Sequence, residues 1–142
     1  MAELPQKQAQ RLAHRPLSPF VTIFRWPVTM ATSIVHRITG VALAGGTILL
    51  AWWLIAASNG PETYAFFTDA AASPLGQIVL FGITWALAFH AANGIRHLAW
   101  DLGYGFELAT ANKSGIAVIV LSLVIAIGFF ALAWTGYGGY YQ

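Results

Sequence analysis

The sequence contains no cysteine and very few charged residues. Only 8% of its 142 residues are charged, against about a quarter in an ordinary soluble domain, while 58% are hydrophobic. The lack of cysteine excludes disulfides, iron-sulfur ligation and thiolate metal sites within this chain. A redox cofactor held here would need histidine or methionine. The shortage of charge excludes an ordinary soluble domain, so lipid is the expected solvent around most of the chain.

The few charges are also unevenly placed. Four basic residues lie within the first 26 positions, and no side-chain charge follows Lys113; the four are Lys7, Arg11, Arg15 and Arg25. A net charge of +2 confined to such flanks excludes nucleic acid as a partner. Glu3 and the absence of an apolar run before Pro16 are unlike a cleaved signal peptide or a transit peptide. We therefore expect a multi-pass protein of the bacterial inner membrane.

Three long uncharged stretches predict three transmembrane helices, at about residues 27–58, 74–102 and 113–135. At 1.5 Å per residue, each is long enough to cross a hydrocarbon core roughly 30 Å thick. Pro27 and Pro74 suit first-turn positions, Ser73 a cap, and Asn112 the cap of the third helix. The expected fold is an all-α membrane protein. It has a cytoplasmic or interfacial segment, 1–26, followed by a three-helix transmembrane domain, 27–142.

The connections between the helices indicate the orientation. The first contains only acidic charges, Glu62 and Asp69, whereas Arg96 and Lys113 flank the second. Because basic residues collect on the cytoplasmic side, we expect a cytoplasmic N-terminus and a periplasmic C-terminus. Residues 62–72 in the first connection are compatible with a short amphipathic helix at the interface.

His90 lies within the second predicted helix, on a stripe of small residues formed by Gly82, Ala86 and Gly94. A histidine at that depth is costly unless it faces protein, and it marks a functional site by default. Small neighbours admit either a close helix or a flat cofactor. Two interpretations stay open at this point: a histidine that packs against a neighbouring helix, and a haem ligand.

Two groups of further polar residues are predicted at the same end of the bundle as His90, and at one depth on the cytoplasmic side, because consecutive helices run antiparallel. They are Ser33, His36 and Arg37 at the start of the first helix, and Arg96 and His97 at the end of the second. His90 and His97 share a helix face, as do Ser33 and Arg37. Such a cluster beside an imidazole suits the two propionates of a haem. The alternative is that Arg37, Arg96 and His97 extend to lipid headgroups.

Three other features have simpler interpretations. Asp101 is placed to orient His97 or Arg96, although a carboxylate at an interfacial helix end is commoner. Gly40 and Ala44 form a small-xxx-small surface, most commonly used for helix packing. The third helix has no ionisable residue between 115 and 134, so it is expected to be structural.

Three motifs resemble the cytochrome b subunit of succinate dehydrogenase. They are RPLSPFVTIFRW at 15–26, SIVHRITG at 33–40 and HAANGIRHLAWDLG at 90–103. The second and third correspond to the family patterns S-x-x-H-R-x-[ST]-G and H-x-x-x-G-x-R-H-x-x-x-D, and the likeness extends over almost the whole chain. Phe20 departs from the pattern, since many relatives carry histidine there.

The resemblance implies a role for each site residue. His90 would be an axial ligand of one haem b, whose other axial histidine comes from a second membrane anchor subunit. His36, Arg37 and His97 would contact the haem propionates. Ser33 and Arg37 would border the ubiquinone pocket. No residue of this chain is expected to be catalytic alone.

The same resemblance implies a membrane anchor subunit of succinate:quinone oxidoreductase, respiratory complex II. FAD would be bound by a flavoprotein subunit and the iron-sulfur clusters by an iron-sulfur subunit, which passes electrons from succinate to ubiquinone. One alternative is a haem-free structural anchor that uses His90 for packing. Another is a small transporter or channel with Arg37, His90 and Arg96 along a polar path, which the uncharged third helix and the lack of repeats disfavour.

Overall fold

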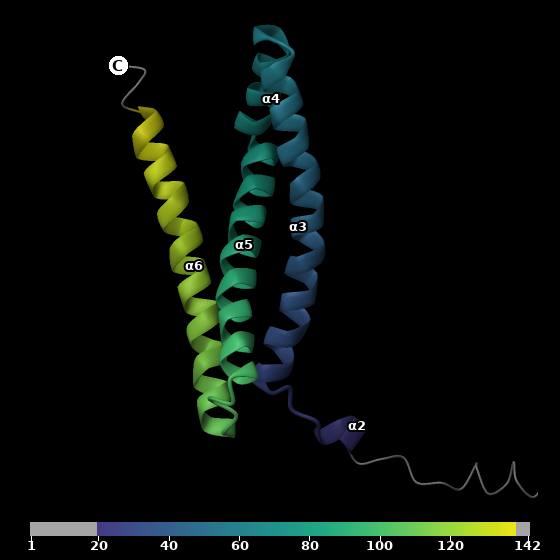
Figure 1. Cartoon of the computed structure of the whole chain (residues 1–142), viewed down its shortest axis with the longest axis vertical. Helices are drawn as coiled ribbons and strands as arrows, with labels where there is room; N and C mark the ends of the chain where they lie inside the picture. Colours follow the sequence, from purple (N-terminus) through teal and green to yellow (C-terminus); the bar gives the residue numbers. More distant parts are fainter. Residues whose placement is uncertain (1–19, 139–142) are drawn as a thin grey trace, which may run out of the picture.

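The structure is a computed structural model that describes residues 20–138. Within that range the regular elements are all helices: α2 (Phe20–Ile23), α3 (Val28–Ser58), α4 (Pro61–Ala72), α5 (Pro74–Asp101) and α6 (Leu108–Gly138) (Figure 1). Three of the four N-terminal basic residues, Lys7, Arg11 and Arg15, lie outside the described residues. An interfacial role for segment 1–26 therefore stays a prediction, as does the division of the chain at residue 27.

Helices α3, α5 and α6 are each long and apolar enough to cross a membrane. Their lengths of 31, 28 and 31 residues exceed the roughly 20 that a hydrocarbon core requires. The prediction of an all-α protein with three transmembrane helices is confirmed. The helix predicted at 62–72 is also present, as α4. The orientation in the membrane stays a prediction.

The junction between α4 and α5 is fixed by a cap and a glycine. The Oγ of Ser73 accepts a hydrogen bond of 3.1 Å from the backbone N–H of Gly76, and Pro74 occupies the first turn, as predicted. A Cβ on Gly76 would collide with the carbonyl oxygens of Ala70 and Ala71. Glycine at this position therefore allows the end of α4 to lie directly against the start of α5.

Helix α6 begins at Leu108, five residues before the predicted start, so Asn112 lies inside the helix and does not cap it. The reason is a tight turn between α5 and α6. Gly103 and Gly105 have φ angles of 87° and 84°, which favour glycine and reverse the chain within a few residues. The backbone N–H of Ala111 already bonds the carbonyl of Glu107, at 2.8 Å.

Helix α5 lies between α3 and α6, and α6 diverges from it towards the C-terminus (Figure 1). The three helices converge where α3 begins. There, a Cβ added to Gly115 of α6 would lie 3.0 Å from Cγ1 of Val28 and 3.6 Å from Cγ2 of Thr32. Glycine thus permits close approach of α6 to α3. Along the divergence, a groove of about 870 Å³ is lined by α5 and α6 residues such as Ala91 and Val118.

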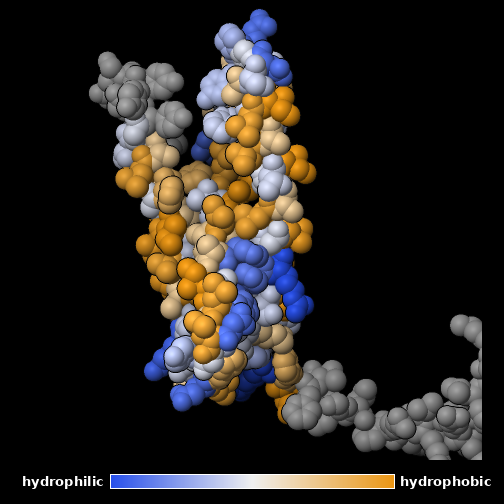
Figure 2. All heavy atoms as spheres, in the orientation of Figure 1, coloured by the Kyte–Doolittle hydropathy of each residue, from blue (hydrophilic) through white to orange (hydrophobic). Residues whose placement is uncertain are grey.

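Few residues are fully buried within the single chain, and most large apolar side chains are exposed. Figure 2 shows this hydrophobic surface over much of the helices, with hydrophilic residues towards both ends and a hydrophilic patch in the lower half of the bundle. The largest fully buried side chains are Phe89 and four polar ones, Asn93, Thr32, Thr39 and Ser122. The faces of the helices are therefore left for lipid or partner chains, while polar contacts join the helices internally.

Candidate functional site

The imidazole of His90 is bonded to α3 through one ring nitrogen. Its Nδ1 lies 3.2 Å from the backbone carbonyl of His36 and 3.2 Å from Oγ1 of Thr39. A carbonyl oxygen accepts hydrogen bonds but never donates them, so these neighbours assign the ring proton to Nδ1. In a neutral ring this position of the proton leaves the lone pair on Nε2, the state that a metal-ligating histidine requires.

Two small residues of α3, Thr39 and Gly40, contact the His90 ring. Oγ1 of Thr39 donates to the carbonyl of His36 at 2.9 Å and so presents a lone pair to His90. A Cβ on Gly40 would lie 3.2 Å from Cε1 of His90, tighter than ordinary contact. Gly40 therefore admits an imidazole, a more specific use than the helix packing expected from the sequence. Thr39 belongs to the SIVHRITG motif, but the sequence did not indicate that it would contact His90.

Three histidines gather at this level, as the antiparallel arrangement predicts. The rings of His36 and His90 are stacked, with centroids 3.9 Å apart and an angle of 12° between their planes. The centroid of the His97 ring lies 5.3 Å from that of His36. The prediction that the start of the first transmembrane helix and the end of the second meet at one depth is confirmed for these three residues.

One ring nitrogen in this histidine cluster lacks a hydrogen-bond partner within the described residues. Nδ1 of His36 is buried and has no partner within residues 20–138. A buried polar atom left unpaired costs free energy, on the order of 1–3 kcal/mol, so such an atom calls for a group from outside the described chain. A carboxylate would accept a hydrogen bond from it. A histidine whose Nε2 makes no hydrogen bond within residues 20–138, beside such an atom, fits an iron porphyrin with acidic side groups.

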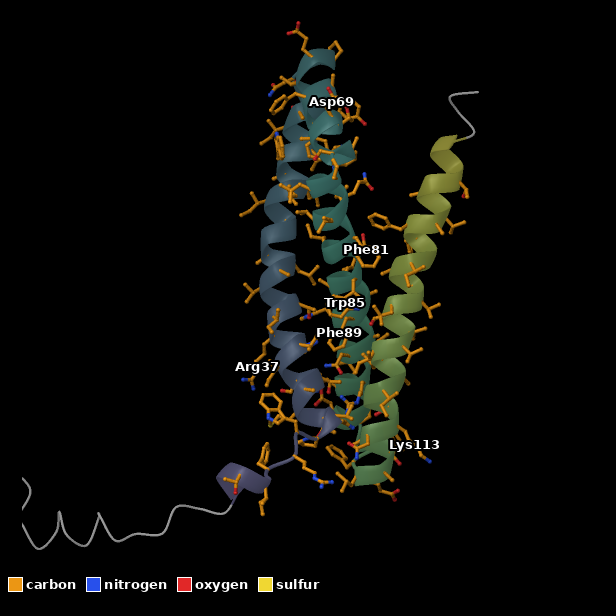
Figure 3. The ribbon with its side chains drawn as sticks, turned by 180° about the vertical axis from the view of Figure 1, so that it is seen from behind. Arg37, Asp69, Phe81, Trp85, Phe89 and Lys113 are labelled. Carbon is orange, nitrogen blue, oxygen red and sulfur yellow. The ribbon has the colours of Figure 1, made fainter. Side chains whose placement is uncertain are left out.

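Ser33 and Arg37 lie on the flank of α3 beside His36. Arg37 is exposed and points away from α5 and α6 (Figure 3), while Ser33 is half-buried. The structure thus does not bring Arg37 to the imidazoles within this chain. Both residues are instead placed where a second chain or a ligand can reach them.

Arg96 differs most from expectation. It is 7% exposed, so the interpretation that it extends to lipid headgroups is wrong. Its guanidinium donates to neutral oxygens, among them Oγ of Ser114 at 2.9 Å and the carbonyl of Ala111 at 2.8 Å. Asp101 is exposed, at the end of α5. Arg96 therefore links helices, and its partners Thr32, Asn93 and Ser114 were not identified from the sequence.

The comparisons with known proteins identify one family. Residues 11–129 match the family model described as succinate dehydrogenase/fumarate reductase transmembrane subunit. The succinate dehydrogenase cytochrome b556 subunit of Paracoccus denitrificans is 46% identical over 80% of this chain and 88% of its own length. The b556 subunit of Rickettsia felis is 39% identical over 80% of this chain and 88% of its own.

A mitochondrial relative extends the similarity beyond bacteria. The succinate dehydrogenase cytochrome b560 subunit of Sus scrofa is 37% identical over 84% of this chain and 72% of its own length. The matched region contains the whole of α3 and α5, α6 as far as Phe129, and the whole histidine cluster. With its three membrane-crossing helices and the histidines between them, this chain belongs to the family of succinate dehydrogenase/fumarate reductase transmembrane subunits.

Proposed function

We propose that this chain is a membrane anchor subunit of a succinate:quinone oxidoreductase, complex II, that binds one haem b jointly with a second anchor subunit and forms part of the ubiquinone-reduction site. The observation that carries the proposal is the hydrogen bond from Nδ1 of His90 to the carbonyl of His36, which leaves Nε2 free. The names of the relatives, cytochrome b556 and cytochrome b560 subunits, support it. The membrane would be the bacterial inner membrane.

In this proposal Nε2 of His90 would ligate the haem iron. When bound, the haem supplies a one-electron redox centre inside the membrane. The bond from Nδ1 to the His36 carbonyl fixes the ring orientation and raises the basicity of Nε2, as outer-shell acceptors do for metal-bound histidines. His36 and His97, and Arg37 from the flank of α3, would hold the propionates. The second anchor subunit would supply the other axial histidine.

The quinone site would be built on Ser33 and Arg37. The hydroxyl of Ser33 is placed to donate a hydrogen bond to a quinone carbonyl or to its ordered water. The guanidinium of Arg37 would stabilise the negative charge that develops on the quinone oxygen during reduction, because a fixed cation in a low-dielectric site acts without reorganisation. Both residues are accessible on one flank of α3, which leaves room for other subunits to complete the pocket.

The remaining cofactors would belong to other subunits. This chain has no cysteine for iron-sulfur ligation, so clusters would reside in an iron-sulfur subunit and FAD in a flavoprotein subunit. The cationic end of the bundle would face the cytoplasm, where those subunits dock. Isolated from them, the chain would be catalytically inert.

A haem-free structural anchor is the second candidate. The stacking of His36 on His90, with the bond to the α3 backbone, would also serve helix packing alone. Purification of the whole complex through an affinity tag on this chain separates the two. We expect co-purification of three partner chains by mass spectrometry and a reduced low-spin b-type spectrum at about one haem per complex. The same partners without haem would support the structural anchor.

A further inference from the structure

We propose that Arg96 is a positioning residue for quinone reduction: it holds the first turns of α3, and with them Ser33, against α5 and α6. The inference rests on the proposed quinone site at Ser33 and Arg37. It assigns to Arg96 a role that the sequence did not indicate.

The guanidinium of Arg96 joins three helices. From α5, its Nη1 donates to Oγ1 of Thr32 on α3 at 3.3 Å. Its Nε donates to Oγ of Ser114 on α6 at 2.9 Å, and its Nη2 to the carbonyl of Ala111 on α6 at 2.8 Å. One planar, rigid fork thus fixes α3 and α6 relative to the same point of α5.

Two further contacts complete the surroundings of this cation. Nη1 also donates to Oδ1 of Asn93 at 3.2 Å, and the guanidinium carbon lies 4.1 Å from the centre of the Trp100 ring. These partners are neutral oxygens and an aromatic face. A buried charge satisfied in this way cannot shift without losing several hydrogen bonds at once, so the arrangement resists displacement.

Thr32 transmits this restraint to the quinone site. Its side chain is 1% exposed, and its Oγ1 donates to the carbonyl of Thr29, which leaves the oxygen to accept from Arg96. The next residue along α3 is Ser33. A rotation or translation of this turn would therefore move the Ser33 hydroxyl directly, whereas His90 is held further along α3, by Thr39 and the His36 carbonyl.

The restraint that Arg96 places on Thr32 is important because it acts in the first turns of α3. Helix α3 begins at Val28, after a stretch, 24–27, without helical structure. Close packing of Gly115 against Val28 and Thr32 occurs at this same level, and α6 diverges from α5 beyond it (Figure 1). A misplacement of about 1 Å at a reacting group can cost about a hundredfold in rate, so a small relaxation here would be measurable.

The test compares Thr32→Val with Thr32→Ser in the intact complex. Valine keeps the β-branched shape but removes the acceptor for Arg96, whereas serine keeps the acceptor. With a short-chain ubiquinone, we expect Thr32→Val to raise KM and lower kcat, with kcat/KM reduced about tenfold. Succinate reduction of an artificial dye and the haem spectrum should stay unchanged, and Thr32→Ser should restore the quinone kinetics.

Ser122→Ala is the matched control. Ser122 is a buried hydroxyl on α6 that donates only to the carbonyl of Ile119 in its own helix, so its loss tests the general cost of removing such a group. We expect quinone kinetics within twofold of the unaltered complex. If Thr32→Val fails to assemble, Thr32→Ala provides the same comparison.

Unchanged quinone kinetics in Thr32→Val, or in Thr32→Ala if that variant replaces it, would overturn the proposal. So would an equal loss of quinone and dye activities in that variant. A third contrary result would be quinone kinetics in Thr32→Ser as impaired as those of Thr32→Val. Ser33→Ala distinguishes this failure from that of the quinone site itself. If Ser33→Ala impairs quinone reduction and Thr32→Val does not, only the role of Arg96 fails. If neither variant affects quinone reduction, both the role of Arg96 and the quinone site assigned to Ser33 are wrong.

Discussion

The ring of His90 stacks on that of His36, with centroids 3.9 Å apart, while its Nδ1 bonds the backbone carbonyl of the same residue at 3.2 Å. His36 thus contributes both its main chain and its side chain to one site. The carbonyl fixes the proton on His90, and the buried Nδ1 of the His36 side chain remains without a partner within residues 20–138. Substitution of the side chain leaves the main-chain contribution in place.

Removing the unpaired nitrogen of His36 should weaken haem binding without changing its axial ligand. In His36→Phe the aromatic stack on His90 and the backbone carbonyl both persist, but the ring nitrogen of residue 36 is lost, which leaves only His97 and Arg37 of this chain to bond the propionates. We expect the spectrum to stay low-spin while haem occupancy falls, with affinity reduced about tenfold. Titration of the purified complex with a competing haem acceptor measures this. Full occupancy and unaltered affinity would show that His36 does not hold a propionate.

A methyl group on Gly40 should displace His90. In Gly40→Ala the new Cβ would lie 3.2 Å from Cε1 of the imidazole, so the ring must shift by a few tenths of an ångström, away from the His36 carbonyl and Thr39 that hold it. Gly45→Ala is the matched control, because nothing lies within 4 Å of its Cβ and alanine favours a helix by up to about 1 kcal/mol. We expect an altered spectrum or lower haem content in the first variant only. Identical haem spectra in both variants would contradict the close contact described between Gly40 and His90.

Loss of Arg37 should impair quinone reduction selectively. Removing one group that stabilises developing charge costs about a hundredfold or more in kcat, so we expect a loss of that order in Arg37→Ala. Ser33→Ala should show a smaller loss, because a hydroxyl offers a neutral hydrogen bond. Succinate reduction of an artificial dye, measured on the same preparations, should be preserved. A parallel fall of both activities would indicate failed assembly.

Gly76→Ala should weaken the complex at a position remote from the cofactor. Its Cβ would collide with the carbonyl oxygens of Ala70 and Ala71, which are held rigidly by α4. Gly82→Ala, on the same helix and with open space around its Cβ, is the control. We expect a lower thermal inactivation temperature for the first variant alone, measured on detergent-solubilised complex. Equal inactivation temperatures would show that the α4 to α5 junction tolerates a side chain.

The sequence predicted the parts of this fold that depend on composition and local chemistry. Apolar length determined the three transmembrane helices, and Ser73 with Pro74 marked the start of α5. The start of α6 was wrong because Asn112 looks like a cap, whereas the two glycines at 103 and 105 complete the turn earlier. The roles of positive-φ glycines depend on backbone geometry, which composition does not reveal.

The residues of the candidate site also divide into those whose positions the sequence predicted and those whose positions it did not. The antiparallel arrangement of consecutive transmembrane helices was enough to predict that His36, His90 and His97 lie near one another. The same reasoning could not tell that Arg96 turns into the bundle while Arg37 turns out of it, because helix rotation depends on packing against the neighbouring helices. Hydroxyl partners such as Thr32 and Ser114 carry no distinctive signal in an apolar helix, so their contacts emerge only in three dimensions.

The absorption spectrum of the His90→Ala complex tests the central claim most directly, that the free Nε2 of this residue ligates haem iron. His97→Ala is the matched control, since it removes a neighbouring imidazole that is not proposed as a ligand. The account predicts that His90→Ala abolishes the low-spin b-type spectrum or converts it to high spin, while His97→Ala stays low-spin. An unchanged low-spin spectrum in an assembled His90→Ala complex would contradict it.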